Sequence, residues 1–301
     1  NDLGFTKLIL VDDIKKTNKW KNLLNKKYVA FISKYQLFDW LKGREKEIEA
    51  FIHLGACSDT LEQNEEYLMQ NNLHYSIRLA EYALRAEHRF IYASSAATYG
   101  DGSQGFIDDH ARLEYLKPLN SYGFSKYAFD LWLKQQGVLD QVVGLKYFNV
   151  FGPNENHKGR MASMIYKMTL LVQKEKLIRL FASSDPDQFA DGEQSRDFIY
   201  VKDACEMTCE FLKNSIGGIF NIGSGATTTW RSLALAIFKT LKTPLNITFI
   251  KMPKELAIQY QNYTCADMQK YIKNVNQPKL YSIEDAVEDY VQNYLIVDKR
   301  W

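Results

Sequence analysis

Short apolar runs alternate with longer amphipathic segments along the first half of the chain. The runs cover residues 7–11, 28–32, 50–55, 89–95 and 142–148. Each has the length and the β-branched or aromatic content of a buried strand. Since the runs are apolar at nearly every position, they are typical of parallel strands that are covered on both faces.

Two segments between these strands have helical periodicity. Residues 65–87 and 122–136 carry apolar side chains three and four positions apart, as helices packed against a sheet do. The repeated order of strand, helix and strand predicts an α/β fold, a Rossmann-type doubly wound parallel sheet. A ligand site in such a sheet lies beyond the carboxyl ends of the strands.

The alternation fades after Met161, which indicates a smaller mixed α/β domain for the substrate. Residues 161–175 and 230–241 have the pattern of helices, and residues 218–225 that of a strand and turn. We therefore expect two interleaved domains. The dinucleotide-binding domain comprises residues 1–150 and 198–243, and the substrate-binding domain comprises residues 151–197 and 244–301.

Composition and charge narrow the class of protein. A net charge of +2 over 301 residues does not favour a nucleic-acid partner. No apolar stretch approaches the roughly 18–20 residues of a membrane helix. Cys205 and Cys209 share a helix face but have no further ligand nearby, so we expect buried thiols, no metal site and a reducing, cytoplasmic location.

Ser95, Tyr122 and Lys126 form the strongest candidate for chemistry. Tyr122 and Lys126 are four residues apart at the start of a predicted helix, so both project from one face. A lysine ammonium beside a phenol stabilises the phenolate and lowers its pKa. With Ser95 at a strand end to orient an alcohol, the set could remove a proton from a carbinol while hydride leaves for a nicotinamide. The structural alternative is that Tyr122 only packs its helix.

Several motifs carry a resemblance to a known family. The segments "YASSAATYG", "PLNSYGFSK" and "KYFNVFGPNE" resemble the extended short-chain dehydrogenases/reductases that modify nucleotide sugars. Within that group, "HLGACSDT", "GPNENHKGRMAS", "RDFIYVKD" and "FNIGSG" are similar to the ADP-L-glycero-D-manno-heptose 6-epimerase family. The similarity runs along nearly the whole chain.

The resemblance implies inversion of C6″ of an ADP-heptose by transient oxidation and re-reduction with a tightly bound NADP. It assigns catalysis to Tyr122, Ser95 and Lys158, with Lys158 as the second acid/base group. It implies a cytoplasmic homo-oligomer, often a pentamer, that supplies heptose for the lipopolysaccharide core. The cofactor residues it implies are Asp12, Asp13, Lys19, Leu54, Gly55, Ala56, Cys57, Ser58, Asn71, Lys126, Val150 and Lys158. The substrate residues it implies are Asn149, Arg160, Lys167, Phe181, Ala182, Ser183, Ser184, Arg196 and Tyr260.

Some positions depart from the family pattern. Asp13 stands where the epimerases carry Asn, and two adjacent acids would repel a 2′-phosphate, so NAD is possible in place of NADP. Lys19 could offset this repulsion. Arg160 replaces a serine and Lys167 a histidine near the expected substrate, which leaves the exact sugar open.

The opening segment resembles a second strand of the family fold rather than a first. Residues 7–11 end in Asp12 and Asp13, acids that would reach an adenosine ribose. By this resemblance we expect about twenty further residues upstream, with a strand and a glycine-rich turn. Without them, we expect weak cofactor binding and low stability.

Two alternatives to the heptose epimerase stay open. The first is another nucleotide-sugar enzyme, a UDP-hexose 4-epimerase or a 4,6-dehydratase. A dehydratase would need an acid/base pair where "SSAATYG" offers alanines and a threonine, and a 4-epimerase would not need Lys158. The second is a catalytically silent nucleotide-binding relative, against which the joint retention of Ser95, Tyr122, Lys126 and Lys158 argues.

Overall fold

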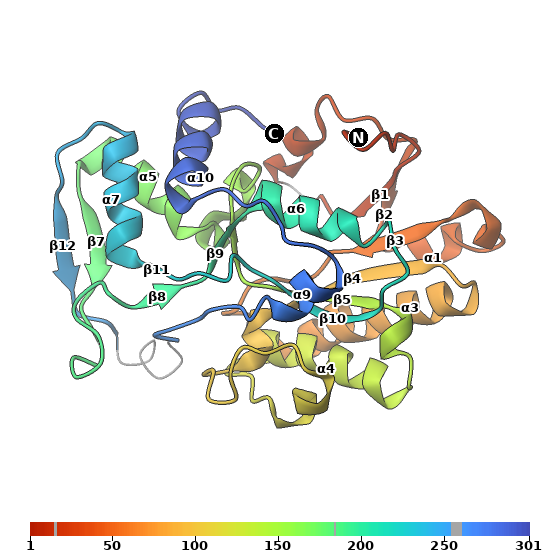
Figure 1. The fold of residues 1–301 in the computed structure, drawn as a ribbon. Helices are drawn as coiled ribbons and strands as arrows, with labels where there is room; N and C mark the ends of the chain where they lie inside the picture. The colour runs from red at the N-terminus through yellow and green to blue at the C-terminus, as the bar shows by residue number, and fades with distance from the viewer. Residues whose placement is uncertain (15–16, 184, 254–260) are drawn as a thin grey trace.

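A parallel sheet with helices on both faces forms the larger part of the protein (Figure 1). The computed structural model describes residues 1–14, 17–183, 185–253 and 261–301. Four parallel strands lie in the order β10, β5, β4, β3, with bounds Gly218–Ile222, Val143–Tyr147, Arg89–Ser95 and Ala50–His53. The predicted α/β class and the strands at 50–55, 89–95 and 142–148 are confirmed.

The helices cover the sheet as their amphipathic patterns predict. α3 (Tyr75–Arg85) and α4 (Ser121–Gln135) lie on one face and α6 (Val201–Glu210) on the other (Figure 1). The predicted helix at 65–87 is present as α2 (Glu65–Leu68), a π-helical stretch (Met69–His74) and α3. The π-helical stretch shifts the helical register just where two asparagines turn toward the strand ends.

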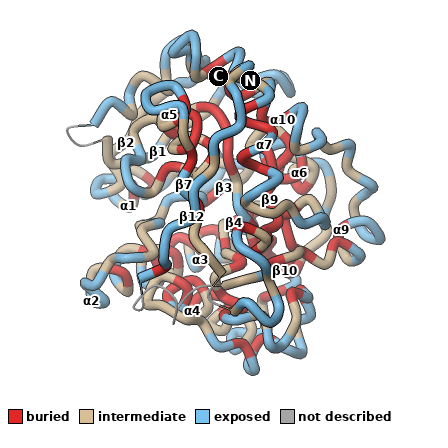
Figure 2. The backbone as a smooth tube through the Cα atoms, turned by 90° about the vertical axis from the view of Figure 1, so that its left-hand side faces the viewer, coloured by how far each residue is buried: buried red, intermediate tan, exposed pale blue. Residues whose placement is uncertain are grey.

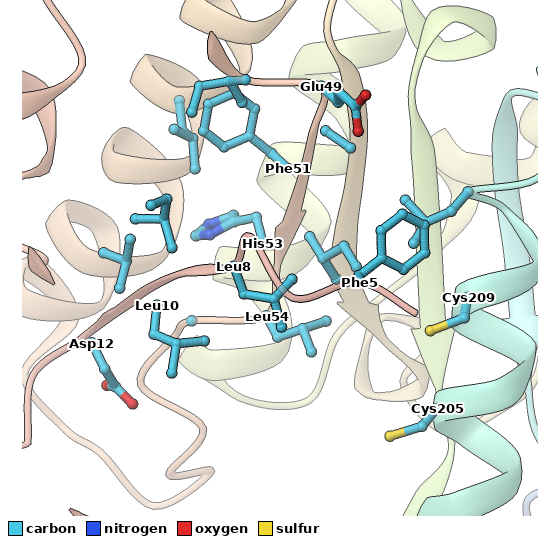
Figure 3. Close-up of a pocket in the computed structure, with 18 of the residues that line it drawn as sticks. Phe5, Leu8, Leu10, Asp12, Glu49, Phe51, His53, Leu54, Cys205 and Cys209 are labelled. Carbon is cyan, nitrogen blue, oxygen red and sulfur yellow. The ribbon is translucent and has the colours of Figure 1, made fainter. Parts of the chain in front are cut away.

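The first two strands form a sheet of their own. β1 (Ile9–Asp12) pairs in parallel with β2 (Ala30–Ser33), and among the described residues no strand joins this pair to β3. A cavity of about 1670 Å³ separates β1 from β3. Figure 3 shows Leu8 and Leu10 on one side of it, Leu54 close by, and Cys205 and Cys209 facing it from α6. Among the described residues, β1 and β2 thus form one parallel group, and β3, β4, β5 and β10 form another.

A second hydrophobic core lies beside the first. It is built by α5 (Met164–Glu175), α7 (Trp230–Thr240), α10 (Ile283–Tyr290) and the strand pair β7 (Ile178–Phe181) and β12 (Ile247–Ile250). Figure 2 shows the buried backbone gathered inside both units and exposed loops around them. The predicted helices at 161–175 and 230–241 are confirmed, with shorter bounds.

Short strand pairs link the two cores. β6 (Asn149–Phe151) pairs in parallel with β9 (Phe198–Tyr200), and β8 (Ser195–Arg196) pairs antiparallel with β11 (Thr228–Thr229). The remaining elements are the helices α1 (Leu37–Trp40) and α9 (Gln269–Asn274), the 3-10 turns Asn18–Leu23, Glu45–Glu47, Ala96–Tyr99, His110–Tyr115, Leu139–Gln141 and Asn156–Met161, and a π-helical turn Val291–Leu295. No helix within the described ranges is both long and apolar enough to cross a bilayer.

Candidate active site

Ser95, Tyr122 and Lys126 meet at the carboxyl end of β4. Ser95 is the last residue of that strand, and Tyr122 lies in the first turn of α4. The side chain of Asn120 caps α4 by accepting a hydrogen bond of 2.8 Å from the Gly123 N–H, which fixes where the helix begins. The Ser95 hydroxyl lies near enough to the Tyr122 phenol to lower its pKa. The structure therefore brings the predicted catalytic set together.

Burial sets the pKa values of this set. It raises the pKa of Tyr122, and the nearby Ser95 hydroxyl offsets only part of the rise. It also lowers the pKa of Lys126 to about 8, opposed by the charge of Asp130 on the next turn of α4. The Lys126 ammonium donates a 2.9 Å hydrogen bond to the Ala93 carbonyl. The expectation that Lys126 lowers the pKa of Tyr122 is not met, because desolvation of the phenol outweighs the stabilising groups around it.

Lys158 lies on the turn Asn156–Met161 and is exposed. The Lys158 N–H donates 2.9 Å to the Glu155 carbonyl, and within the described structure its ammonium forms no hydrogen bond or ion pair. The ends of this turn are held by Glu155, whose carboxylate accepts from the backbone N–H and hydroxyl of Ser163 at 2.5 and 2.7 Å and from Tyr290 at 2.8 Å. The loop that carries Lys158 is therefore anchored while its side chain is free to reach a ligand.

Seven of the predicted cofactor residues line the cavity between β1 and β3. They are Asp12, Asp13, Lys19, Leu54, Gly55, Ala56 and Asn71. Figure 3 shows Asp12 at the carboxyl end of β1, at the opposite end of the cavity from Glu49. Lys19 pairs with Asp12 at 2.6 Å, and the Tyr35 hydroxyl donates to Asp13 at 3.2 Å. Asp12 and Asp13, the acids predicted to reach a ribose, thus line the cavity, and each contacts one of these partner side chains.

Asn72 is a site residue that the sequence analysis missed. Its side chain accepts from the Cys57 N–H at 2.8 Å and donates to the Cys57 carbonyl and to Ser125, each at 3.0 Å. Asn72 is 1% exposed, so it ties the loop after β3 to the helix that carries Tyr122. The signal in the sequence that could have identified Asn72 is a second amide side chain directly after the predicted Asn71, within an amphipathic helical segment.

The other predicted cofactor residues lie on neighbouring loops. Cys57 is positioned by Asn72, and Ser58 is an exposed residue of the same loop. Val150 lies in β6 and is half-buried, one residue from the exposed Asn149. The Asn149 N–H donates 3.1 Å to the Asp197 carbonyl, which fixes β6 against the segment that contains Arg196.

Arg196 is buried beside Asp197, whose carboxylate ties two loops together. The Arg196 guanidinium donates 3.1 Å to the Ser195 carbonyl and lies 6.0 Å from the centre of the Trp230 ring. The next residue, Asp197, accepts from the N–H groups of Ser224 at 2.7 Å, Gly225 at 3.0 Å and Ala266 at 2.9 Å. The cation predicted to meet a diphosphate is therefore set in a rigid frame.

Arg160 and Lys167 are joined to each other and to the loop after β3. The Arg160 guanidinium contacts Asp59 at 2.5 Å, and the Lys167 ammonium donates 2.6 Å to the Arg160 carbonyl. Phe181 ends β7, Ala182 and Ser183 follow it, and all three are half-buried. Two predicted substrate residues, Ser184 and Tyr260, lie outside the described residues. Among the described residues, there is no group of three or more histidine, cysteine or acidic side chains that could hold a metal ion.

Comparisons with known proteins place this geometry in a family. The model of the NAD dependent epimerase/dehydratase family matches residues 29–223. An ADP-L-glycero-D-manno-heptose-6-epimerase of Nitratidesulfovibrio vulgaris (strain DP4) is 44% identical over 299 residues, 98% of this chain and 92% of the relative. A protein of the same name from Fusobacterium nucleatum subsp. nucleatum is 40% identical, with the same two coverages.

Solved structures agree with the sequence relatives. The crystal structure of the Helicobacter pylori ADP-L-glycero-D-manno-heptose-6-epimerase superposes with a TM-score of 0.78 at 28% identity, covering 95% of this chain and 87% of that one. The UDP-N-acetylglucosamine 4-epimerase from Methanobrevibacter ruminantium M1 has a TM-score of 0.76 at 21% identity, covering 97% and 99%. The second likeness shows the fold alone.

Proposed function

The chain belongs to the NAD dependent epimerase/dehydratase family and, within it, to the ADP-L-glycero-D-manno-heptose-6-epimerases, and we propose that it inverts C6″ of ADP-D-glycero-D-manno-heptose. The observation that supports this most is the contact between Ser95 and Tyr122 at the end of β4, with Lys126 on the same helix. The product would be ADP-L-glycero-D-manno-heptose, used for the heptose of the lipopolysaccharide core.

Tyr122 is proposed to exchange the proton of the C6″ hydroxyl. To accept that proton Tyr122 must be the phenolate, and burial opposes this because it raises the pKa of Tyr122. We propose that the Ser95 hydroxyl and the positive charge of Lys126 stabilise the phenolate, which takes the C6″ hydroxyl proton as hydride leaves the carbon and gives the proton back when hydride returns. Lys158 is proposed as the second acid/base group, since inversion presents the same hydroxyl in a second orientation and its exposed ammonium is unpaired in the described structure.

A nicotinamide cofactor, when bound, supplies reversible hydride acceptance for this reaction. The residues present fit its two ends: Asp12 and Lys19 line the cavity and would hold the adenosine ribose, and Lys126, on the helix that carries Tyr122, would hold the second ribose. We propose NADP, with Lys19 facing the 2′-phosphate. NAD is the alternative, because Asp12 already occupies Lys19.

The substrate side is proposed from the remaining family positions. Arg196 would bind the ADP diphosphate with its forked guanidinium, and Asn149 would contact the sugar. Phe181, Ala182, Ser183, Ser184 and Tyr260 would surround the nucleotide sugar, with Arg160 and Lys167 at its sugar end. By the same family resemblance, we propose two interleaved domains and a cytoplasmic location. The oligomer would be a homo-oligomer, a pentamer.

Proton NMR of ADP-D-glycero-D-manno-heptose incubated with the protein and its nicotinamide cofactor tests this function. We expect a mixture of the two C6″ epimers with no net reduction of the cofactor. Tyr122→Phe should abolish conversion, whereas Tyr127→Phe, on the same helix with its hydroxyl on the Glu114 carbonyl, should not. Lys158→Met should reduce conversion strongly, and Lys174→Met, on the exposed side of α5, is its control.

Two outcomes would redirect the proposal. Full activity of Lys158→Met toward a UDP-hexose would indicate a 4-epimerase. If cofactor binds but the ADP-heptose is not converted, the substrate is another nucleotide sugar, and Arg160 and Lys167 become the residues that decide it.

A further inference from the structure

A buried ion pair lies beneath the strand end that carries Ser95. The Lys146 ammonium, from β5, is 2.8 Å from a carboxylate oxygen of Asp130, from α4, and both side chains are 0% exposed. The carboxylate also accepts hydrogen bonds from Tyr92 at 2.9 Å and from Ser94 at 2.7 Å. No step assigned so far to the catalytic residues uses this pair.

The ion pair is bonded to the chain on both sides of Ser95. On one side, the Ser94 hydroxyl donates to Asp130. On the other, Lys146 donates to the Thr98 hydroxyl at 2.5 Å, and Thr98 in turn donates to the Ser95 carbonyl at 2.8 Å. Thr98 is 0% exposed. Ser95, the residue beside Tyr122, therefore lies between Ser94 and Thr98, which are both hydrogen-bonded to this one ion pair.

The same pair fixes the helix of the catalytic tyrosine relative to this segment. Asp130 lies one helical turn beyond Lys126 and two turns beyond Tyr122 on α4. Through Ser94 and Tyr92 its carboxylate binds α4 to β4, and Lys126 makes a second link through the Ala93 carbonyl at 2.9 Å. The strand end with Ser95 and the helix with Tyr122 thus share one polar anchor.

Stability alone does not account for such a pair. Removing two charges from water costs several kcal/mol per ion, and well-packed apolar side chains in their place are often neutral or stabilising. Every oxygen of the Asp130 carboxylate is hydrogen-bonded, so the arrangement specifies geometry rather than adding net stability.

We propose that the Asp130–Lys146 pair is a positioning unit for the reaction, acting through Ser94 and Thr98 to hold the Ser95 hydroxyl against the Tyr122 hydroxyl. Neither charge touches the substrate. This inference rests on the proposed function for its kinetic readout. It predicts that loosening the link at Thr98 slows the chemical step without changing how tightly the substrate is bound.

Thr98→Val is the sharpest test. Valine keeps the shape of threonine and leaves the Asp130–Lys146 contact in place, but it removes both bonds of the Thr98 hydroxyl. We expect kcat to fall on the order of tenfold or more with KM unchanged within about twofold, because misplacing a catalytic group by a fraction of an ångström has effects of this size. Hydrogen–deuterium exchange of the segment 94–100 should also rise.

Thr169→Val is the matched control, a buried threonine whose hydroxyl donates 2.7 Å to the Ile165 carbonyl within α5, in the second core. It should leave kcat and the exchange of residues 94–100 unchanged. A Thr98→Val protein with the kcat of the wild type would overturn the proposal. An equal fall of kcat in both valine variants would do the same, since it would reveal a general loss of stability.

Changing the ion pair itself gives a second, independent measurement. The double variant Asp130→Asn with Lys146→Met removes both charges of the pair, and it should fold and lose kcat as Thr98→Val does. Since Asp130 also opposes the lowered pKa of the Lys126 ammonium, the exchange of residues 94–100, which that pKa does not set, should rise as well. A fully active double variant would refute the positioning role.

The two hypotheses fail in distinguishable ways. If the wild-type protein does not convert ADP-heptose, the proposed function is wrong, and the exchange of residues 94–100 in Thr98→Val against Thr169→Val still decides the positioning role. If the wild-type protein is active and neither kcat nor exchange responds to Thr98→Val, only the positioning role is wrong.

Discussion

The buried histidine His53 makes the stability of this protein depend on pH in a way that can be measured. His53 ends β3, where its Nε2 is 2.9 Å from the Ser76 hydroxyl, and the Ser76 hydroxyl donates to the Asn72 carbonyl at 2.5 Å. Because Ser76 has one hydrogen and donates it to Asn72, the imidazole must itself donate, as a neutral ring protonated on Nε2. A second proton would charge a ring that is 9% exposed.

The magnitude follows from the pKa in the two states. Burial, with a smaller contribution from the positive charge of Lys126, lowers the pKa of His53 from 6.5 to about 3 in the folded protein. Since the folded pKa lies below the unfolded one, the stabilisation is fully present above pH 6.5 and is lost as the pH falls toward 3. Between pH 7.5 and pH 5 the titration of His53 should therefore cost about 2 kcal/mol, from roughly 1.5 pH units at 1.36 kcal/mol each.

Urea unfolding followed by tryptophan fluorescence, at pH 7.5 and at pH 5, measures this loss. His53→Gln retains a side-chain donor for Ser76 but does not titrate, so its stability should fall by about 2 kcal/mol less than that of the wild type between the two pH values. His74→Gln is the control, because His74 is exposed on the neighbouring π-helical stretch. It should follow the wild type.

The refuting result is equally clear. If the wild type and His53→Gln lose the same free energy of unfolding between pH 7.5 and pH 5, His53 is not the buried neutral group that its surroundings indicate. His110, whose pKa is also lowered by burial, titrates in both proteins and therefore cancels in the comparison.

Three further variants test the frame of the site. Asn72→Ala should lower the free energy of unfolding by about 2 kcal/mol or more, because it leaves the Cys57 amide unpaired, and should weaken cofactor binding; unchanged unfolding and cofactor titrations would contradict this. Glu155→Gln should cost about 1–3 kcal/mol in urea unfolding, against less than about 0.5 for the surface variant Glu175→Gln. Gly123→Ala should reduce kcat roughly tenfold or more, because the new Cβ would lie 2.8 Å from the Ala97 carbonyl and push α4 away from Ser95; a kcat equal to that of the wild type would show that α4 can shift without harm.

Periodicity predicted the local structure well, because each strand and helix is decided by side chains close in sequence. The strand at 89–95 and the helix at 122–136 are observed almost residue for residue. The placement of Tyr122 and Lys126 on one helix was also predictable, since four residues along a helix bring two side chains to one face.

Periodicity did not predict the partners of charged residues that lie inside apolar runs. Asp130 and Lys146 each interrupt a run of core residues, but their partners come from different elements, 16 positions apart. A sequence pattern shows that such a charge is misplaced in a core, and only the folded chain shows what neutralises it.

What the sequence determined by itself is the α/β class, the order of the strands along the chain and the residues that meet at their carboxyl ends. The tertiary structure decided which strands pair and the raised pKa of Tyr122. The physical reason is that pairing and desolvation depend on groups brought together from distant parts of the chain, whereas strand and helix periodicity is a property of neighbours.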